Sequence, residues 1–153
     1  MYAELHCHST FSLLDGASDP ERLVERAVEL GLSALALTDH DDLGGAVRFA
    51  TAASAAGLPG IIGTELSVET VDGRRWTVDT TASSTVHRLP STVSHLVLLA
   101  EDRAGYANLS SLITRARMDH PRGTPRVSLD TLAAHTDGLY ALTRCARGAV
   151  PRS

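Results

Sequence analysis

The sequence predicts an α/β fold, with a layer of roughly five parallel strands, crossover helices and one hairpin-like excursion. Segments typical of strands and of amphipathic helices alternate along the 153 residues, as parallel βαβ units require. Hydrophobic residues make up 43% of the chain but aromatic residues only 4%, so Leu, Val, Ile and Ala must fill the core. Five strands leave open edges, and a closed barrel is therefore not expected.

The first βαβ unit is predicted over residues 2–38. Residues 2–6 form a short strand, and residues 18–21 have the capping-box pattern that begins a helix. Gly31 can end this helix in a left-handed conformation, and the apolar run 33–38 then suits a buried parallel strand. One face of the helix is expected to pack on the core through Leu23, Val24, Ala27, Val28 and Leu30.

A second unit follows the same order. Leu43, Val47 and Ala50 recur at helical spacing, and Gly57 followed by Pro59 ends the helix before a strand at 60–68. The segment 69–93 then interrupts the alternation, because Asp72-Gly73 favours a tight hairpin turn and a Ser- and Thr-rich stretch follows. We expect this segment to be an insertion in, or an excursion from, the scaffold.

The alternation resumes with a strand at 96–100. Asp102 can cap the next helix, Ser128 begins a short helix through His135, and 138–143 is the last strand, followed by a polar tail at 144–153. The core side of the longer helix is expected to contain Tyr106, Leu109, Ile113 and Ala116. Because the pattern stops before a full sheet, we expect an open edge that would permit self-association.

Charge and composition exclude several classes of protein. Fourteen basic and eighteen acidic residues give a formal charge of -4, which argues against strong autonomous binding to nucleic acid. No apolar run approaches the roughly 20 residues that cross a bilayer, and the first residues lack the pattern of a signal peptide, so we expect a cytoplasmic protein. In that compartment Cys7 and Cys145 favour thiol or metal-ligand roles over a disulfide.

His6 and His8 are the first candidate metal ligands. In an extended strand their spacing of two places both imidazoles on one face, while Cys7 points away. Zinc, manganese or iron would each accept these nitrogens. Since short His-x-His sequences also occur by chance, a polar strand end explains this pair equally well.

His40 and Glu65 follow two apolar strands, at the edge where α/β proteins assemble their sites. The ring of His40 is expected to point to the same edge of the sheet as the rings of His6 and His8. Asp39 could orient a ligating imidazole. A carboxylate such as Glu65 can bridge two cations and lower their mutual repulsion. Glu65 alone is better explained as an exposed edge residue, but the three strand ends together favour a metal site.

Other polar residues allow a purely structural explanation. Asp15 lies in an Asp-Gly turn, and Asp41 or Asp42 can cap the following helix. His95 at the head of a strand and Cys145 after the last strand are each, taken alone, more often partly buried structural residues than ligands. Three further histidines in loops or at helix ends are not expected to bind metal, namely His87, His120 and His135.

Four segments together resemble the PHP (polymerase and histidinol phosphatase) domain, and the resemblance runs from residue 2 to about 150. The segments are Tyr2–Ser9, Leu14–Ala17, Ala36–Asp41 and Gly63–Leu66. In addition, residues 95–100 and 105–109 resemble the N-terminal PHP domain of bacterial C-family polymerases, particularly error-prone DNA polymerase III alpha subunits. The resemblance implies a distorted, seven-stranded βα barrel, here an incomplete PHP domain over 1–150.

The resemblance also implies up to three divalent metal ions that activate water for phosphoester hydrolysis. It assigns ligand roles to His6, His8, Asp15, His40, Glu65, His95 and Cys145, with Asp39 in support. A closing Asp-x-His motif of the family is absent, so two ligands are missing and an incomplete set of ions is expected. Arg144 and Arg147 also flank Cys145, where the family has small residues.

Three functions fit these residues. The first is an N-terminal PHP fragment of an error-prone polymerase alpha subunit, with a partial site of phosphoesterase or 3′–5′ exonuclease type and no polymerase module of its own, acting on a phosphoester or a DNA end. The second is a separate metal-dependent phosphoesterase of the histidinol-phosphatase type. The third is a non-catalytic remnant or interaction module, which would take up metal weakly.

Overall fold

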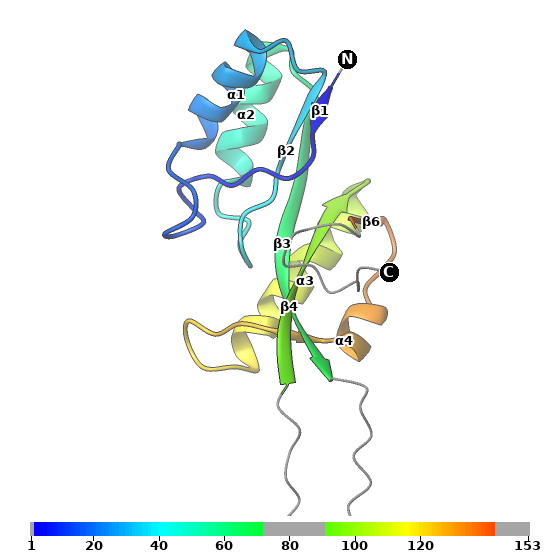
Figure 1. Ribbon diagram of the computed structural model, residues 1–153. Coiled ribbons are helices and arrows are strands. Elements are labelled where there is room, and N and C mark those ends of the chain that lie inside the picture. The colour runs from blue at the N-terminus through cyan, green and yellow to red at the C-terminus, as the bar shows by residue number, and fades with distance from the viewer. Residues whose placement is uncertain (1, 72–90, 143–153) are drawn as a thin grey trace, which may run out of the picture.

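A curled sheet of six strands forms the centre of the fold (Figure 1). The computed structural model describes residues 2–71 and 91–142. Hydrogen-bonded neighbours follow the order β1, β2, β3, β4, β6, and β5 pairs with β3 outside this path. The strands are β1 (Ala3–Glu4), β2 (Ala34–Leu37), β3 (Gly60–Val71), β4 (Ser91–Ala100), β5 (Val127–Ser128) and β6 (Leu139–Leu142).

Helices cover the two halves of this sheet separately. In Figure 1, α1 (Pro20–Glu29) and α2 (Ala46–Ala56) lie side by side against the half that contains β1 and β2. The longer helix α3 (Arg103–Met118) packs on β3 and β4, and the short α4 (Leu129–Ala133) follows β5 directly. The twelve-residue strand β3 extends through both halves and connects them.

The predicted α/β class is confirmed, but the expectation of parallel strands throughout is wrong. Strands β1, β2 and β3 pair in parallel, whereas β4 runs antiparallel to both β3 and β6. The change occurs at Gly63, since β3 pairs with β2 through Ile62 and with β4 from Gly63 onward. A Cβ at Gly63 would lie 2.5 Å from the carbonyl oxygen of Leu98, so glycine permits this close approach of β4.

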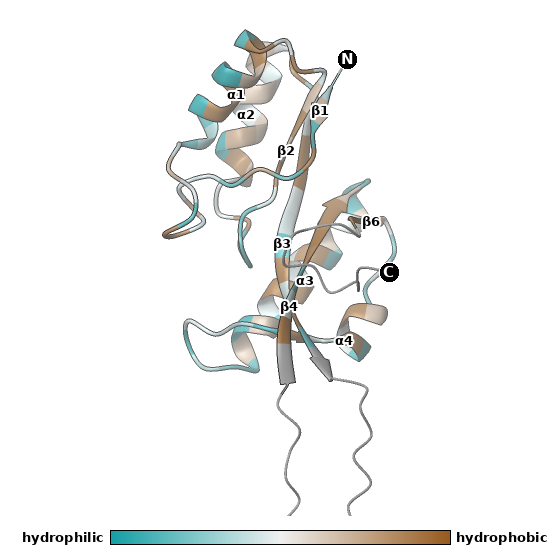
Figure 2. Cartoon of the chain, in the orientation of Figure 1, coloured by the Kyte–Doolittle hydropathy of each residue, from teal (hydrophilic) through white to brown (hydrophobic). Residues whose placement is uncertain are grey.

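Two hydrophobic cores hold the helices on the sheet. In Figure 2 the hydrophobic colour is clear along β4. The first lies between α1, α2 and β2 and is made of Val24, Ala27, Leu35, Leu37, Phe49, Ala53 and Leu58. The second lies under α3 and is made of Leu66, Val68, Leu98, Leu109, Leu112, Ile113, Ala116 and Val127. A smaller cluster on Ala36, Val97 and Leu99 packs the opposite side, as the alternation of β-strand side chains requires.

Several helix faces are rotated from the predicted ones. Val47 is 74% exposed, and α2 buries Ala46, Phe49 and Ala53 instead, because the aromatic ring of Phe49 fills the space beside β2. Val28, Leu30 and Tyr106 are also exposed, although they were expected to face the core. Apolar spacing alone could not distinguish which of two overlapping helical stripes faces the sheet.

The predicted helix ends are confirmed at Gly31, Gly57, Asp102 and Ser128. Gly31 and Gly57 have positive φ and end α1 and α2, and the carboxylate of Asp102 accepts a hydrogen bond from the backbone N–H of Gly105. The capping box at 18–21 is not formed. Asp19 occupies the N-cap position without a side-chain cap, because its carboxylate accepts a hydrogen bond from the hydroxyl of Thr10.

The described ends of the predicted excursion belong to the sheet. Glu69–Val71 and Ser91–Val93 extend the antiparallel ladder of β3 and β4. The predicted Asp72-Gly73 turn and the tail at 144–153 lie outside the described residues. Strands β1 and β6 end the strand order, and self-association through an open edge stays a prediction. Among the described residues, none of the helices has the length and hydrophobicity of a membrane-spanning segment.

Gly105→Ala should destabilise the protein strongly. A Cβ at this position in the first turn of α3 would collide with the backbone carbonyl of Gly138 and lie 3.3 Å from the Cα of Ala100. Backbone cannot rotate away as a side chain can, so we expect a loss of about 1–3 kcal/mol in the free energy of unfolding. Urea denaturation measures it, and the exposed Thr114→Ala on the same helix should change this free energy by less than about 0.5 kcal/mol. Equal effects of the two variants would contradict the close contact.

Candidate metal centre

The carboxylate of Glu65 is surrounded by four imidazole rings. Its Oε2 lies 2.5 Å from Nε2 of His6 and 3.0 Å from Nε2 of His8, while its Oε1 lies 3.3 Å from Nδ1 of His95 and 3.9 Å from Nδ1 of His40. The side chain of Glu65 is only 3% exposed, whereas the four imidazoles are 14–31% exposed. The histidines therefore form the open rim of a site that has the carboxylate at its base.

Strand pairing places Glu65 and His40 together. Glu65 was expected near the end of its strand but lies in the middle of β3, which continues to Val71. Its neighbour β2 ends at Leu37, and beyond it His40 forms a parallel bridge with Glu65. Backbone hydrogen bonds fix this pairing, from the N–H of Glu65 to the carbonyl of Asp39 and from the N–H of Asp41 to the carbonyl of Glu65. The side chains thus meet at the carboxyl end of β2.

His6 and His8 reach the same site from the segment after β1. Strand β1 ends at Glu4, shorter than the predicted 2–6, but Cys7 still pairs with Thr38: the N–H of Thr38 donates to the carbonyl of Cys7. The N–H of Cys7 in turn donates to the hydroxyl of Thr38. This extended pairing turns both imidazoles to the carboxylate, and Cys7 points away from them, as predicted. Cys7 packs instead on the core with α1 and α2.

Asp15 and His95 complete the cluster. Asp15 Oδ2 lies 2.8 Å from Nε2 of His40 and 3.2 Å from Nδ1 of His8. His95 lies within β4, where its backbone is paired with Ser67, and its ring is 5.5 Å from that of His40. The structural explanation for Asp15 as an Asp-Gly turn holds locally, but its side chain also joins the histidines.

Asp39 holds the loop that carries Asp15. The carboxylate of Asp39 is buried and accepts three hydrogen bonds of 2.7 Å, from the N–H and hydroxyl of Ser9 and from the hydroxyl of Ser12. Ser12 also accepts a hydrogen bond from the backbone N–H of His40. The sequence suggested that Asp39 could orient a ligating imidazole; its hydrogen bonds go to the 9–12 loop, and Ser12 of that loop binds the backbone of His40.

Asp41 and Asp42, either of which was predicted to cap the following helix, have other partners in the structure. Asp41 and Asp42 were expected to cap α2, but Gly45 is the N-cap. The buried carboxylate of Asp41 accepts hydrogen bonds from the N–H and hydroxyl of Ser67 on β3, and Asp41 has a positive φ of 47°. Asp42 forms an ion pair with Arg117 at the end of α3. No periodic pattern in the sequence signals these partners, which come from distant segments.

The donor set fits divalent metal ions. Three groups each bring three ligand atoms within 4.8 Å of one another: His6, His8 and Glu65; His8, Asp15 and His40; and His40, Glu65 and His95. Nδ1 of His8 and Nδ1 of His95 are buried without a hydrogen bond in suitable geometry, although carboxylate oxygens lie 3.2 and 3.3 Å away. Buried nitrogens without a partner, next to carboxylates, suit coordination of zinc, manganese or iron.

The electrostatics of the cluster couple Glu65 to His8. Burial raises the pKa of Glu65, but hydrogen bonds with His8 and His6 outweigh this effect and hold the pKa at about 2. The same hydrogen bond to Glu65 raises the pKa of His8 above its usual value, against the opposing effect of burial. In the absence of metal, a proton on His8 therefore compensates the buried carboxylate.

The metal-free protein should be most stable in mildly acidic solution. Because the pKa of His8 is raised in the folded state, its contribution is complete below the ordinary value of 6.5 and is lost as the pH rises through the raised value. The lowered pKa of Glu65 gives a contribution that is present above 4.5 and lost as the pH falls towards 2. In EDTA, the thermal midpoint should be higher at about pH 5.5 than at about pH 8.5.

The variant His8→Gln, in the same measurement, provides the control. His8→Gln should remove much of the decrease between these two pH values, since glutamine does not titrate. A wild-type midpoint that increases towards alkaline pH in EDTA would contradict this coupling. Because a metal ion must displace the proton of His8, metal affinity should increase over the same interval.

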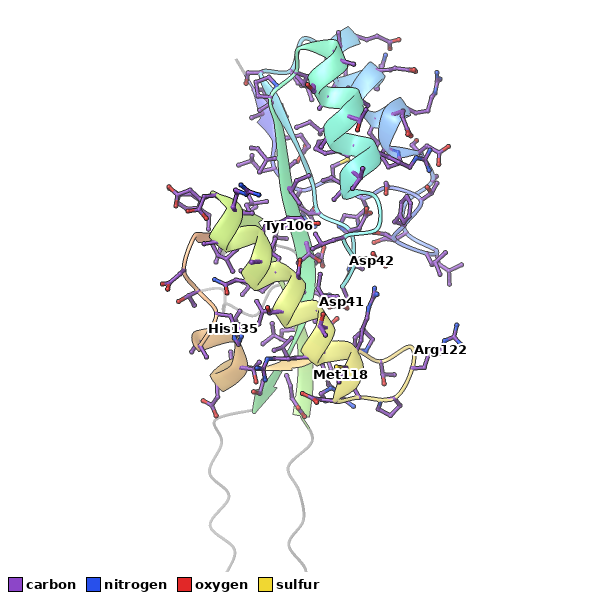
Figure 3. All side chains as sticks on the ribbon, turned by 180° about the vertical axis from the view of Figure 1, so that it is seen from behind. Asp41, Asp42, Tyr106, Met118, Arg122 and His135 are labelled. Atoms are coloured by element: carbon purple, nitrogen blue, oxygen red, sulfur yellow. The ribbon has the colours of Figure 1, made fainter. Side chains whose placement is uncertain are left out.

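The structure thus brings together six of the seven predicted ligands. They are His6, His8, Asp15, His40, Glu65 and His95. Cys145 lies outside the described residues, as does His87. His120 and His135, which were not expected to bind metal, lie outside the groups of described residues that could hold one, and Figure 3 shows His135 beyond α4, away from Asp41. The prediction missed Ser9, Ser12 and Arg117, which support the loops of the site.

This fold and this cluster of histidines and carboxylates define the class of protein. Residues 4–153 match the family model of the PHP domain, and the chain belongs to this family. Its curated relatives include an error-prone DNA polymerase of Cutibacterium acnes, 49% identical over 97% of this chain, and an error-prone DNA polymerase of Mycobacterium tuberculosis, 45% identical. DNA polymerase III subunit alpha of Treponema pallidum is 39% identical over 98% of the chain. The chain spans only 12–13% of the length of these relatives.

Two solved structures share the fold with a TM-score of 0.54 each. One is described as a metal-dependent phosphoesterase from Bifidobacterium adolescentis, 29% identical, and the other as an amidohydrolase from Chromobacterium violaceum with bound sulfate and no metal, 32% identical. Each match covers 77% of this chain and 34% of the other. The family match and the polymerase relatives confirm the resemblance to the PHP domain and to error-prone DNA polymerases that the sequence suggested.

Proposed function

We propose that this chain is a metal-dependent phosphoesterase module whose centre is built on Glu65. The observation that carries the proposal is the buried carboxylate of Glu65 with His6 and His8 on one oxygen and His95 on the other. A carboxylate with ligands on both oxygens is suited to bridge two cations. When bound, such ions supply an activated water and stabilise negative charge on the phosphoryl oxygens.

The residues of the chain have separate roles in this proposal. Glu65 would hold divalent ions together with His6 and His8 on one side and with His40 and His95 on the other. Asp15, whose side chain is half-exposed, would complete the coordination from the solvent side. The buried Asp39 keeps the loop with Asp15 in place through Ser9 and Ser12. Zinc, manganese and iron all suit this nitrogen and oxygen set.

The polymerase relatives suggest where such a module acts. Because these relatives are DNA polymerases, they support a phosphoester of nucleic acid as substrate, with hydrolysis of 3′–5′ exonuclease type at a DNA end. They also support a cytoplasmic location. The polymerase activity of these relatives is a property of chains about eight times longer, and we assign no part of it to the residues of this centre.

Metal content and hydrolysis test the proposal together. The chain is stripped with a chelator, reloaded with Mn²⁺ or Zn²⁺, analysed for bound metal and assayed on bis(p-nitrophenyl) phosphate. We expect retained metal, a thermal midpoint that falls on chelation, and hydrolysis that decreases at least about 100-fold in His8→Ala. His135→Ala, which removes an imidazole that contacts the carbonyl of Thr131, is the matched control and should remain near wild type.

Each outcome of this experiment has a clear meaning. Folded protein that retains no first-row metal would overturn the metal centre. Metal retention without hydrolysis would overturn the phosphoesterase and favour a non-catalytic module. Equal losses in the two variants would show that the effect of His8→Ala is not specific to the cluster.

A further inference from the structure

Asp41 lies at the point where the chain leaves the parallel pairing that holds His40 beside Glu65. Two backbone hydrogen bonds form this pairing, from the N–H of Glu65 to the carbonyl of Asp39 and from the N–H of Asp41 to the carbonyl of Glu65. In a regular parallel ladder the next bond would run from the N–H of Ser67 to the carbonyl of Asp41. Asp41 instead has a φ of 47°, so the chain turns away from β3 and the ladder ends here.

The side chain of Asp41 takes the place of its own carbonyl in the ladder. Its Oδ1 accepts a hydrogen bond of 2.8 Å from the N–H of Ser67, and its Oδ2 accepts one of 2.7 Å from the hydroxyl of the same serine. The displaced carbonyl accepts a hydrogen bond of 2.7 Å from the guanidinium of Arg117 on α3. Figure 3 shows Asp41 beside the end of α3 that carries Met118. The buried Asp41 therefore has a partner for its N–H, its carbonyl and both carboxylate oxygens.

These contacts connect the backbone segments that carry three of the candidate ligands. His40 directly precedes Asp41, while Ser67 lies two residues after Glu65 on the same face of β3 and is paired with His95 on β4. The side chains of His40, Glu65 and His95 form one of the groups that could hold a metal. Asp41 is not a member of these groups, so it can influence metal binding only through the positions of the ligands or through its charge.

We propose that Asp41 is a positioning residue of the metal centre, which fixes the ring of His40 relative to Glu65 and His95. The inference rests on the proposed metal centre. Without the carboxylate, the left-handed conformation loses the hydrogen bonds from Ser67 that stabilise it against its strain. The peptide after His40 then rotates to return its carbonyl to the ladder, and the rotation moves the imidazole. Arg117 supports the same conformation from α3, because it holds the displaced carbonyl.

Cobalt binding to variants of Asp41 tests this role without an activity assay. The chain is stripped with a chelator and titrated with Co²⁺, and the visible absorption of the bound ion is recorded. Asp41→Ala should raise the Kd for Co²⁺ about tenfold or more and change the spectrum at saturation, since His40 no longer coordinates in the same geometry. Asp41→Asn should stay within about threefold of wild type with an unchanged spectrum, because its amide can accept from the N–H of Ser67 and donate to the hydroxyl. Asparagine also tolerates the left-handed conformation.

A second pair of variants tests the contact from α3, at side chains that are partly exposed and whose replacement leaves the core unchanged. Arg117→Met removes both the hydrogen bond to the carbonyl of Asp41 and the ion pair with Asp42. Asp42→Asn removes only the charge of that ion pair and is the matched control. We expect Arg117→Met to raise the Kd for Co²⁺ about threefold to tenfold. Asp42→Asn should change it less than about twofold.

The comparisons separate position from charge and from general stability. Equal Kd values for Asp41→Ala and Asp41→Asn would show that the position of His40 does not depend on these hydrogen bonds, and would overturn the inference. An unchanged saturated spectrum in Asp41→Ala, or equal effects of Arg117→Met and Asp42→Asn, would also overturn it. Wild type that binds no Co²⁺ would overturn the metal centre and this inference with it. A failure of phosphoester hydrolysis alone would leave the inference standing, because cobalt binding is measured without substrate.

Discussion

Glu65→Gln is expected to abolish the metal centre while leaving the fold intact. Glutamine has nearly the shape of glutamate but lacks the charge, and this side chain is the only acidic group at the base of the described cluster. Without it, the rings of His6, His8 and His95 lose their common partner, and two cations would repel each other without a bridging carboxylate. We expect bound metal to fall to trace amounts and hydrolysis to decrease by about 10³-fold or more.

Metal analysis and the chromogenic assay measure this effect, and Glu25→Gln is the matched control. Glu25 lies on the exposed face of α1, where it pairs with Arg22, so the same change there should leave metal content and hydrolysis unaltered. A Glu65→Gln variant that keeps its full metal complement would contradict the bridging role. Loss of the cooperative thermal transition would instead indicate that the carboxylate is needed for folding.

Asp39→Ala should be among the most destabilising substitutions in the chain. The Asp39 side chain is buried, and its removal leaves two hydroxyl groups and one backbone N–H of the 9–12 loop without their acceptor. Unsatisfied buried donors and the loss of charge-assisted hydrogen bonds together cost about 3–5 kcal/mol of the free energy of unfolding. Because Ser12 also binds the backbone of His40, metal affinity should decrease as well.

Urea denaturation in EDTA separates the effect on stability from the effect on metal binding. Asp19→Ala removes an exposed carboxylate that accepts a hydrogen bond from Thr10 in the same region, and it should cost no more than about 1 kcal/mol. A loss for Asp39→Ala as small as that of the control would show that the loop is held by other contacts.

The candidate ligands could be predicted because each signal is local. His6 and His8 stay on one side of an extended segment even where β1 has ended, since Thr38 continues to pair with Cys7. His40 directly follows the apolar strand β2, and in a parallel sheet the next strand passes beside it. Glu65 was predicted near the end of its own strand but lies within β3. It still meets His40, because the neighbouring strand β2 ends before His40 and the chain beyond it passes beside Glu65.

The supporting contacts could not be predicted, because they depend on tertiary structure. Ser9 and Ser12 resemble any other loop serines in the sequence, and only the folded chain shows that they enclose Asp39. The pairing of Asp42 with Arg117 joins residues 75 positions apart. The antiparallel direction of β4 was missed for the same reason: an alternating pattern of strands and helices favours parallel pairing, whereas β4 pairs antiparallel with β3.

The position of Glu65 on a strand shared by both halves of the sheet has a consequence for assembly. His6 is 59 positions before Glu65 in the chain, and His95 is contributed by β4 on the other side. Closing loops of this length costs entropy before any contact is gained, so we expect the ligands to converge late during folding. Cation uptake during refolding would then report the pairing of β4 with β3, and a nascent chain lacking β4 would bind the ion incompletely.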